Sequence, residues 1–181
     1  MIALLLALTV SANQGSAVQL TIPNEPGVKS VAITWSNKKV PAFRVEDQWT
    51  AVLGIDLDSK PGKHTADILF TMQDGHLARR EAIIQVTSKK YPTTQLEVDD
   101  RYVELSKPDL ERANRESKET EGIFATITNE MLWTEPFTVP IPGENGTNFG
   151  HRRIFNGQPR APHAGADLRA KTGTPIHATN H

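Results

Sequence analysis

The stretch that decides the fold is residues 64–88, "HTADILFTMQDGHLARREAIIQVTS". Its two halves are rich in β-branched and aromatic residues and alternate in part with a period of two, which is typical of β-strands with one buried face. Gln73, Asp74 and Gly75 separate the halves, and an Asp-Gly pair favours a tight hairpin turn. The stretch therefore predicts an antiparallel β-hairpin.

The same pattern extends outward from Val18 to about Thr87. The runs "VQLTI", "KSVAITW", "VPAFRVE" and "QWTAVLGID" share the strand-like composition. Turn-forming residues separate the runs at Pro23 to Gly27, Ser36-Asn37 and Ser59 to Gly62. About six or seven short strands at this spacing predict a small antiparallel sandwich of immunoglobulin-like type. We expect Trp35 and Trp49 to pack in its core or on a sheet face rather than to stack on a ligand.

The composition of the chain limits the possible functions. With 181 residues, the chain has room for one large domain or two small ones. Hydrophobic residues make up 38% and charged residues 23%, as in a soluble globular protein, and the net charge of -1 gives no electrostatic reason to expect nucleic acid as a partner. The chain has no cysteine, so any metal must be held by His and carboxylate side chains.

The N-terminal segment "MIALLLALTVSANQGSA" contains an apolar run from Ile2 to Val10. This run is too short to span a bilayer, which takes about 20 residues, but it suits the core of a secretory signal peptide. Small residues that fit a cleavage site follow at positions 10–12 and 15–17. However, no Lys or Arg precedes the run, so a buried strand is the alternative. We predict a signal peptide over 1–17 and export to the periplasm or cell envelope.

A helix is predicted to begin near Ser106. The order Ser106, Lys107, Pro108, Asp109 has the form of a capping box, and proline fits the first turn of a helix. The segment that follows, "DLERANRESKET", is strongly charged, and we expect it to form a solvated helix face rather than a docking surface. Glu111 and Arg115 are four residues apart in the order that favours pairing.

A His and an Asp lie four residues apart, as His163 and Asp167, in the segment "FGHRRIFNGQPRAPHAGADLRAKTGTPIHA". Its glycines and prolines interrupt any long helix, so helix packing does not explain the pair. The spacing alone is a weak signal, because a His and an Asp on a loop can both be satisfied by solvent. The residues around the pair make the signal more specific.

This segment resembles the beginning of the catalytic domain of lysostaphin-type zinc metallopeptidases, a family of peptidoglycan endopeptidases. The matching elements are Phe149-Gly150, Arg152-Arg153, Phe155-Asn156-Gly157, His163-x-Gly165-x-Asp167, and Gly173-Thr174-Pro175 with Ala178. The charged helix and the segment from Trp133 to Phe137 are similar to the connector of bacterial envelope members of the family.

The resemblance implies that His163 and Asp167 are two protein ligands of a Zn2+ ion. In the family the third ligand is the second His of a later HxH motif, and neighbouring His groups assist at the metal-bound water. The present sequence reaches His181 before any HxH motif, so the resemblance implies a truncated metallopeptidase with no catalytic base within this chain. His177 and His181, four residues apart, lack the Glu of an HExxH motif and are not expected to bind metal.

The resulting prediction is a mainly β protein with four segments. These are a signal peptide (1–17), a β-sandwich accessory domain (18–95), a helical connector (96–135) and the incomplete N-terminal part of a zinc metallopeptidase domain (136–181). The resemblance implies that the protein cleaves peptide bonds in the stem or cross-link of peptidoglycan and meets other envelope proteins. One alternative is a non-catalytic member that binds and activates another cell-wall hydrolase. Another is a sandwich binding module with an unstructured tail.

Overall fold

The structure is a computed structural model that describes residues 8–99, 105–128, 130–133, 135–143 and 145–180. The chain divides into two compact units. The first consists of Met1–Lys89 with Thr128–Glu130, and the second of Lys90–Ile127 with Met131–His181.

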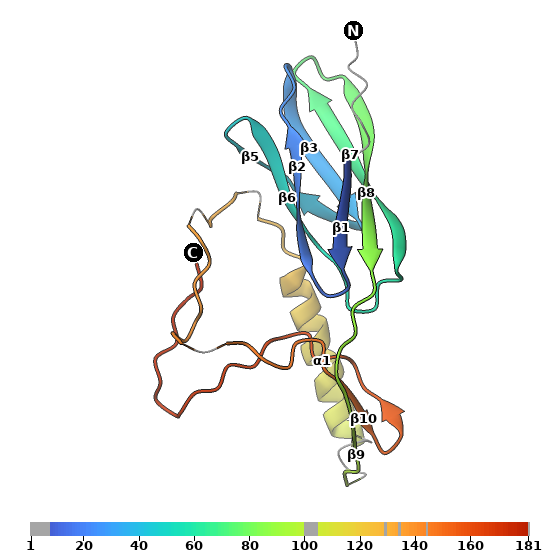
Figure 1. Ribbon diagram of the computed structural model, residues 1–181, viewed down its shortest axis with the longest axis vertical. Coiled ribbons are helices and arrows are strands. Elements are labelled where there is room, and N and C mark those ends of the chain that lie inside the picture. Colours follow the sequence, from blue (N-terminus) through green and yellow to red (C-terminus); the bar gives the residue numbers. More distant parts are fainter. Residues whose placement is uncertain (1–7, 100–104, 129, 134, 144, 181) are drawn as a thin grey trace. The chain divides into compact units, whose positions relative to one another are not determined.

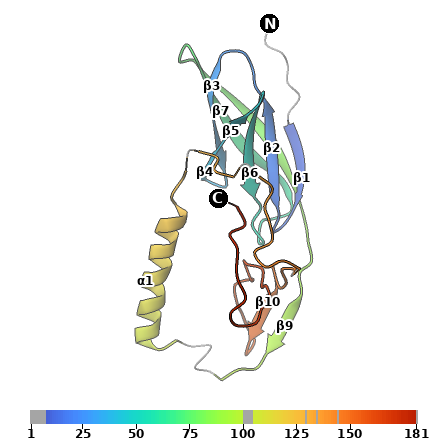
Figure 2. The same ribbon diagram turned by 90° about the vertical axis from the view of Figure 1, so that its left-hand side faces the viewer.

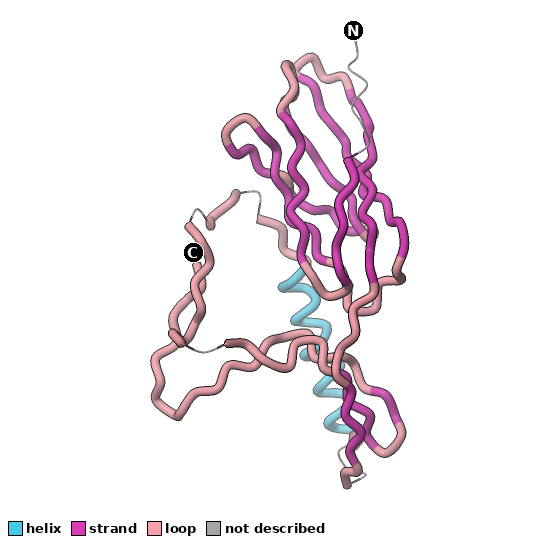
Figure 3. Tube along the Cα trace, in the orientation of Figure 1, coloured by secondary structure: helices cyan, strands magenta, loops and turns pink. Residues whose placement is uncertain are grey.

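The first unit contains two β-sheets (Figures 1 and 3). The larger sheet has the order β1-β8-β7-β3-β4, with β1 at Leu8–Asn13, β8 at Leu77–Thr87, β7 at Gly62–Met72, β3 at Val28–Trp35 and β4 at Lys38–Pro41. The smaller sheet has the order β2-β6-β5, with β2 at Ala17–Pro23, β6 at Gln48–Gly54 and β5 at Phe43–Val45. The predicted fold class, mainly β with an N-terminal sandwich, is confirmed.

The hairpin predicted from residues 64–88 is strands β7 and β8, which pair antiparallel up to Thr71 and Leu77. Gly75 has a φ of 86°, a left-handed conformation that glycine adopts at little cost. The side chain of Asp74 accepts a hydrogen bond from the backbone N–H of His76 at 2.9 Å, as an Asp in a turn commonly does. The Asp-Gly signal therefore places the turn correctly.

The core of the first unit lies between the two sheets, because alternate residues of each strand point inward. The most deeply buried side chains are Leu20 and Leu53 from the smaller sheet and Ile33, Ile84 and Val86 from the larger one. Burial of each such side chain stabilises the fold by about 1.5–3 kcal/mol. The predicted packing of Trp35 and Trp49 is confirmed, since 6% and 8% of their surfaces are exposed.

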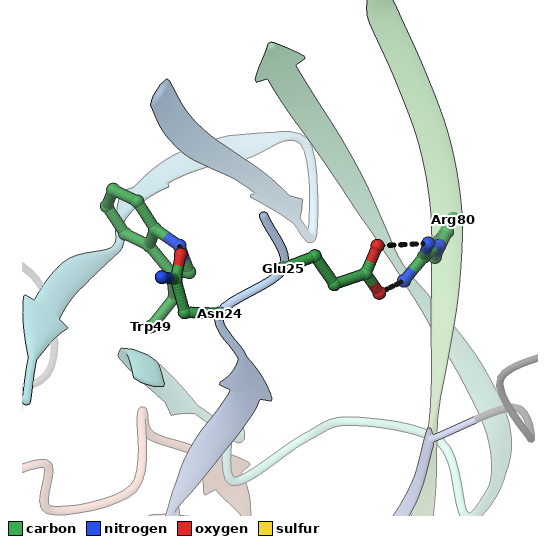
Figure 4. A network of polar contacts seen from close by, with 4 residues as sticks. All are labelled: Asn24, Glu25, Trp49 and Arg80. Atoms are coloured by element: carbon green, nitrogen blue, oxygen red, sulfur yellow. Dashed lines mark hydrogen bonds and ion pairs between the residues drawn. The ribbon is translucent and has the colours of Figure 1, made fainter. Parts of the chain in front are cut away.

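Polar contacts at the edge of this core connect the two sheets (Figure 4). Trp49 Nε1 donates to Asn24 Oδ1 at 3.0 Å, so the buried indole N–H is satisfied. The next residue, Glu25, forms a two-pronged ion pair with Arg80 of β8, whose Nη2 lies 2.9 Å from Oε2. This hydrogen bonding lowers the pKa of Glu25 and raises the pKa of Arg80. The Arg80 guanidinium also lies 5.0 Å from the centre of the Phe70 ring.

The segment predicted as a signal peptide, residues 1–17, overlaps strand β1. Leu8–Asn13 pairs in parallel with β8, from Leu8 opposite Ala82 to Asn13 opposite Thr87, and Ala12 is buried. Residues 1–7, where most of the apolar run lies, are outside the described residues. The sequence left a buried strand as the alternative to a signal peptide. For Leu8–Asn13 the structure supports that alternative, because alternate residues of this segment pack toward the sandwich core.

The second unit contains a three-stranded sheet with the order β11-β10-β9. Its strands are β9 at Thr93–Leu96, β10 at Arg152–Phe155 and β11 at Gln158–Pro159. The sequence prediction drew the first domain boundary after residue 95, whereas the first unit ends at Lys89 and β9 pairs in parallel with β10. Because this pairing joins residues far apart in the chain, the local sequence pattern gave no sign of it.

The predicted helix is α1, Lys107–Phe124 (Figure 2). The side chain of Ser106 accepts from the backbone N–H of Asp109 at 3.4 Å and donates to the Asp109 carboxylate at 2.6 Å, which confirms the predicted cap. None of the helix residues is buried, in agreement with a solvated face. The ion pair along the helix joins Arg112 and Glu116 rather than the predicted pair. Within the described part of the chain, no helix has the length and apolar character needed to cross a membrane.

Candidate metal centre

The structure brings the two predicted metal ligands together. His163 Nε2 lies 3.0 Å from Asp167 Oδ1, and neither residue belongs to a helix. Asp167 is held by its backbone, which exchanges two hydrogen bonds of 2.9 Å with the backbone of Thr147 in an isolated β-bridge. The His163 side chain is 26% exposed and that of Asp167 48%, so both can be reached from solvent.

The backbone of His163 is fixed beside the start of β10. Gly150 N–H donates to His163 O at 2.8 Å, and His163 N–H donates to His151 O at 3.0 Å. Gly150 has a φ of 75°, and a Cβ atom there would lie 2.2 Å from Cδ1 of Tyr91. A side chain at this position would require the Tyr91 ring to move, which accounts for the glycine there.

Asn148 orients the Asp167 carboxylate. Its Nδ2 donates to Asp167 Oδ2 at 2.8 Å, while the other carboxylate oxygen faces His163. This hydrogen bond is the largest cause of the lowered pKa of Asp167, and His163 and Arg153 act in the same direction. Asp167 is therefore held as a carboxylate, the form that binds a cation.

The contacts of His163 define which ring nitrogen carries the proton. Gly165 N–H donates to His163 Nδ1 at 3.1 Å, so Nδ1 is an acceptor. Nε2 then carries the proton and donates to Asp167. A His that binds a metal through Nε2 carries its proton on Nδ1. Metal binding at Nε2 therefore requires the proton to move and the hydrogen bond from Gly165 to open.

The donor set fits part of a zinc site. Two ligand atoms of a tetrahedral zinc ion stand about 3.3 Å apart, since each lies about 2.0–2.1 Å from the metal. His163 Nε2 and Asp167 Oδ1, at 3.0 Å, are close to that spacing. Among the residues that the structure describes, no group of three or more His, Asp or Glu side chains is placed to hold a metal. The described part of the chain thus provides two donors.

The other histidines near the C-terminus do not join this pair. His151 Nε2 lies 2.8 Å from Thr94 Oγ1, and its side chain is engaged there. The backbone N–H of His177 donates to Pro140 O, and the structure records no interaction between its side chain and Asp167. His181 lies outside the described residues.

Sequence reasoning missed the residues that support the pair, namely Asn148, Thr147 and Tyr91. They lie far from Asp167 in the chain, and none belongs to a pattern that indicates a carboxylate or histidine partner. The φ of 64° at Asn148 is a conformation that asparagine adopts more readily than most residues, but the sequence does not reveal it.

Comparison with known proteins supports the fold. No protein-family profile matches the chain, and no curated protein matches it. Among solved structures, a protein from Pseudomonas aeruginosa described as a candidate M23 peptidase aligns with a TM-score of 0.59 and 22% identity. The alignment covers 90% of this chain and 57% of that chain, so the present chain spans little more than half of the other.

Two further structures are more distant. The Siglec domain of GspB aligns at a TM-score of 0.36 and 11% identity, over 91% of this chain and 94% of that one. Murine CRIg aligns at 0.29 and 10% identity, over 45% of this chain and 92% of that one. These two carry no argument about function. The chain therefore has a β-rich fold similar to that of a candidate M23 peptidase.

Proposed function

We propose that this protein is a zinc-dependent endopeptidase that cleaves peptide bonds in bacterial peptidoglycan. The observation that carries the proposal is the pair of His163 Nε2 and Asp167 Oδ1, 3.0 Å apart and partly exposed. Its support comes from the Asn148 amide, which orients the carboxylate, and from the fold similarity to a candidate M23 peptidase.

The residues of the pair have distinct roles in this proposal. His163 and Asp167 would hold the zinc ion, one through a nitrogen and the other through a carboxylate oxygen. When bound, zinc supplies a Lewis acid for the scissile carbonyl and lowers the pKa of a bound water toward about 7. Asn148 lowers the pKa of Asp167 and holds Oδ2 by a hydrogen bond, which leaves Oδ1 facing His163. The backbone hydrogen bonds with Gly150 and His151 hold the backbone of His163 beside the start of β10.

A catalytic zinc site has three protein ligands and one open position. We propose that the third ligand, and the His groups that move protons, come from an HxH motif in the full-length gene product. Export to the periplasm or cell envelope, where peptidoglycan and possible envelope protein partners occur, belongs to the same proposal.

The second candidate function is a non-catalytic protein that binds and activates another cell-wall hydrolase. The observation in its favour is that the described residues provide only two metal donors. The close approach of His163 to an ionised Asp167 favours the enzyme, because a regulator has no need of oriented metal ligands.

The test uses the full-length gene product and measures bound zinc together with hydrolysis of purified peptidoglycan. We expect one zinc per chain and hydrolysis, with both lost in His163→Ala and in Asp167→Ala. The matched control is His177→Ala, an exposed His without side-chain contact to the pair, which should keep both. Retention of zinc and activity in either ligand variant overturns the site. Zinc-free wild-type protein that stimulates a second hydrolase supports the regulator instead.

A further inference from the structure

A cavity of about 640 Å³ adjoins His163 within the second unit. Its lining includes His151, Arg153, Phe155, Arg160 and His163. No Asp or Glu is among the described residues that line it. The cavity therefore brings two arginines and a proposed metal ligand together on a partly apolar lining, and the arginines are suited to an anion.

The hairpin of β10 and β11 places the two arginines side by side. The backbone N–H of Arg160 donates to Arg153 O at 2.9 Å, one position beyond the pairing of Ile154 with Pro159. The turn is fixed by positive φ values at Asn156 and Gly157, 48° and 78°, the pattern of a tight type I′ turn. Like charges opposite each other on neighbouring strands destabilise a hairpin.

The two arginines are held differently. The guanidinium of Arg160 lies 5.8 Å from the centre of the Phe155 ring, a cation–π contact that orients it. Arg153 is exposed and forms no ion pair with any side chain that the structure describes. Its charge helps to lower the pKa of Asp167, which places the guanidinium within electrostatic reach of the His163–Asp167 pair.

We propose that Arg153, with Arg160 beside it, binds a carboxylate group of the peptide substrate in this cavity. The planar fork of an arginine matches the two oxygens of a carboxylate and forms two parallel hydrogen bonds with it. Because His163 lines the same cavity, a side-chain carboxylate bound there would hold an internal amide bond of the peptide near the proposed metal position. The inference rests on the proposed function, since that function supplies the peptide.

The test is a binding titration on the 181-residue chain without zinc. The probes are acetyl-alanyl-glutamyl-alaninamide (the acid) and the same peptide with Gln in place of Glu (the amide), which differ only in the side-chain carboxylate, and inorganic phosphate serves as a second anion. Binding is followed through the backbone amide resonances of Phe155, Gly157 and His163. We expect the acid to bind about tenfold more tightly than the amide, because a charge-assisted hydrogen bond is stronger than a neutral one.

Variants of the two adjacent arginines isolate the proposed contact. Arg153→Gln should remove the preference for the acid to within twofold, and Arg153→Lys should keep part of it through its charge. The matched control is Arg152→Gln, because strand alternation directs Arg152 away from the cavity. If Arg153→Gln fails to fold, as judged from its amide spectrum, a reduced preference for the acid in Arg153→Lys decides.

Equal binding of acid and amide to the wild-type chain overturns the inference, as does an unchanged preference in the Arg153 variants. Phosphate binding as tight as that of the acid peptide overturns the assignment to a carboxylate. The preference for the acid does not require zinc or turnover. A full-length protein that lacks hydrolysis while this chain prefers the acid would therefore refute the proposed function and leave the carboxylate site standing.

Discussion

Replacing Gly150 by Ala should destabilise the backbone around the candidate site, although Gly150 is not itself a proposed metal ligand. Gly150 has a φ of 75°, and a Cβ atom added there would lie 2.2, 2.4 and 2.7 Å from three ring atoms of Tyr91. The left-handed backbone costs an L-residue about 1–2 kcal/mol. The ring must also move by roughly 1 Å, which in packed surroundings costs about 1–3 kcal/mol more. The local structure should therefore lose about 2–5 kcal/mol.

Gly157→Ala is the matched control for this substitution. Gly157 has a nearly identical φ of 78°, but nothing lies within 4 Å of an added Cβ atom. The Gly157→Ala substitution should therefore destabilise the protein only through the left-handed backbone conformation, by about 1–2 kcal/mol. The double variant Gly150→Ala with Tyr91→Ala should regain the part of the stability that the clash removes, because the Tyr91 ring is then absent. Tyr91 also meets Phe149 edge-on at 6.1 Å, so Tyr91→Ala alone supplies the baseline for that lost contact.

Amide hydrogen exchange measures these effects at the site itself. The N–H groups of Gly150 and His163 both donate to backbone carbonyls, so their opening free energies report the local structure. We expect a larger loss of protection in Gly150→Ala than in Gly157→Ala, and partial recovery in the double variant. Equal losses in the two single variants would refute the clash with Tyr91, and unchanged protection in both would refute the backbone argument.

Three other predictions concern the ion pair, the carboxylate and the first strand. Glu25→Gln should lower the free energy of unfolding of the first unit by about 1 kcal/mol at pH 7. Because Arg80 lowers the pKa of Glu25, the wild type should lose this advantage as the pH falls below about 4 through the folded pKa, and thermal melts against pH test this. Asn148→Ala should raise the pKa of Asp167 in a carbon NMR titration, and an unchanged value would exclude the amide as its cause. Deleting residues 1–13 should lower the melting temperature of the first unit, whereas an unchanged melt would favour a dispensable leader segment.

The sandwich could be predicted because its information is local. The alternation in β7 and β8 and the Asp74-Gly75 turn can both be recognised from neighbouring residues, and together they predict this hairpin. The run "VPAFRVE" shows the limit of this reasoning, since it contains two strands. β4 ends at Pro41 in the larger sheet and β5 begins at Phe43 in the smaller one. A change of sheet depends on packing against distant strands, which the local pattern does not encode.

The candidate site could be predicted only in part for a related reason. The spacing of His163 and Asp167 places both residues on one short segment, so their approach needs little long-range information. The orientation of Asp167 depends on Asn148, 19 residues earlier in the chain. That contact exists because the segments around Thr147 and Asp167 form a bridge. A pairing of two short irregular segments has no periodic signature, so sequence patterns do not reveal it.

The hydrogen bonds of the His163–Asp167 pair also bear on how tightly a metal can be held. A cation that enters between Nε2 and Oδ1 must displace the proton that now joins them, and it must open the bond from Gly165 to Nδ1. Both changes oppose binding, because the proton must move from Nε2 to Nδ1 and the Gly165 N–H then loses its acceptor. Two ligands are poorly able to offset these losses, whereas a third ligand adds a bond without a further tautomer change at His163. In the proposed site a third donor is therefore needed for tight binding, so the zinc content of the protein should depend on the presence of that donor.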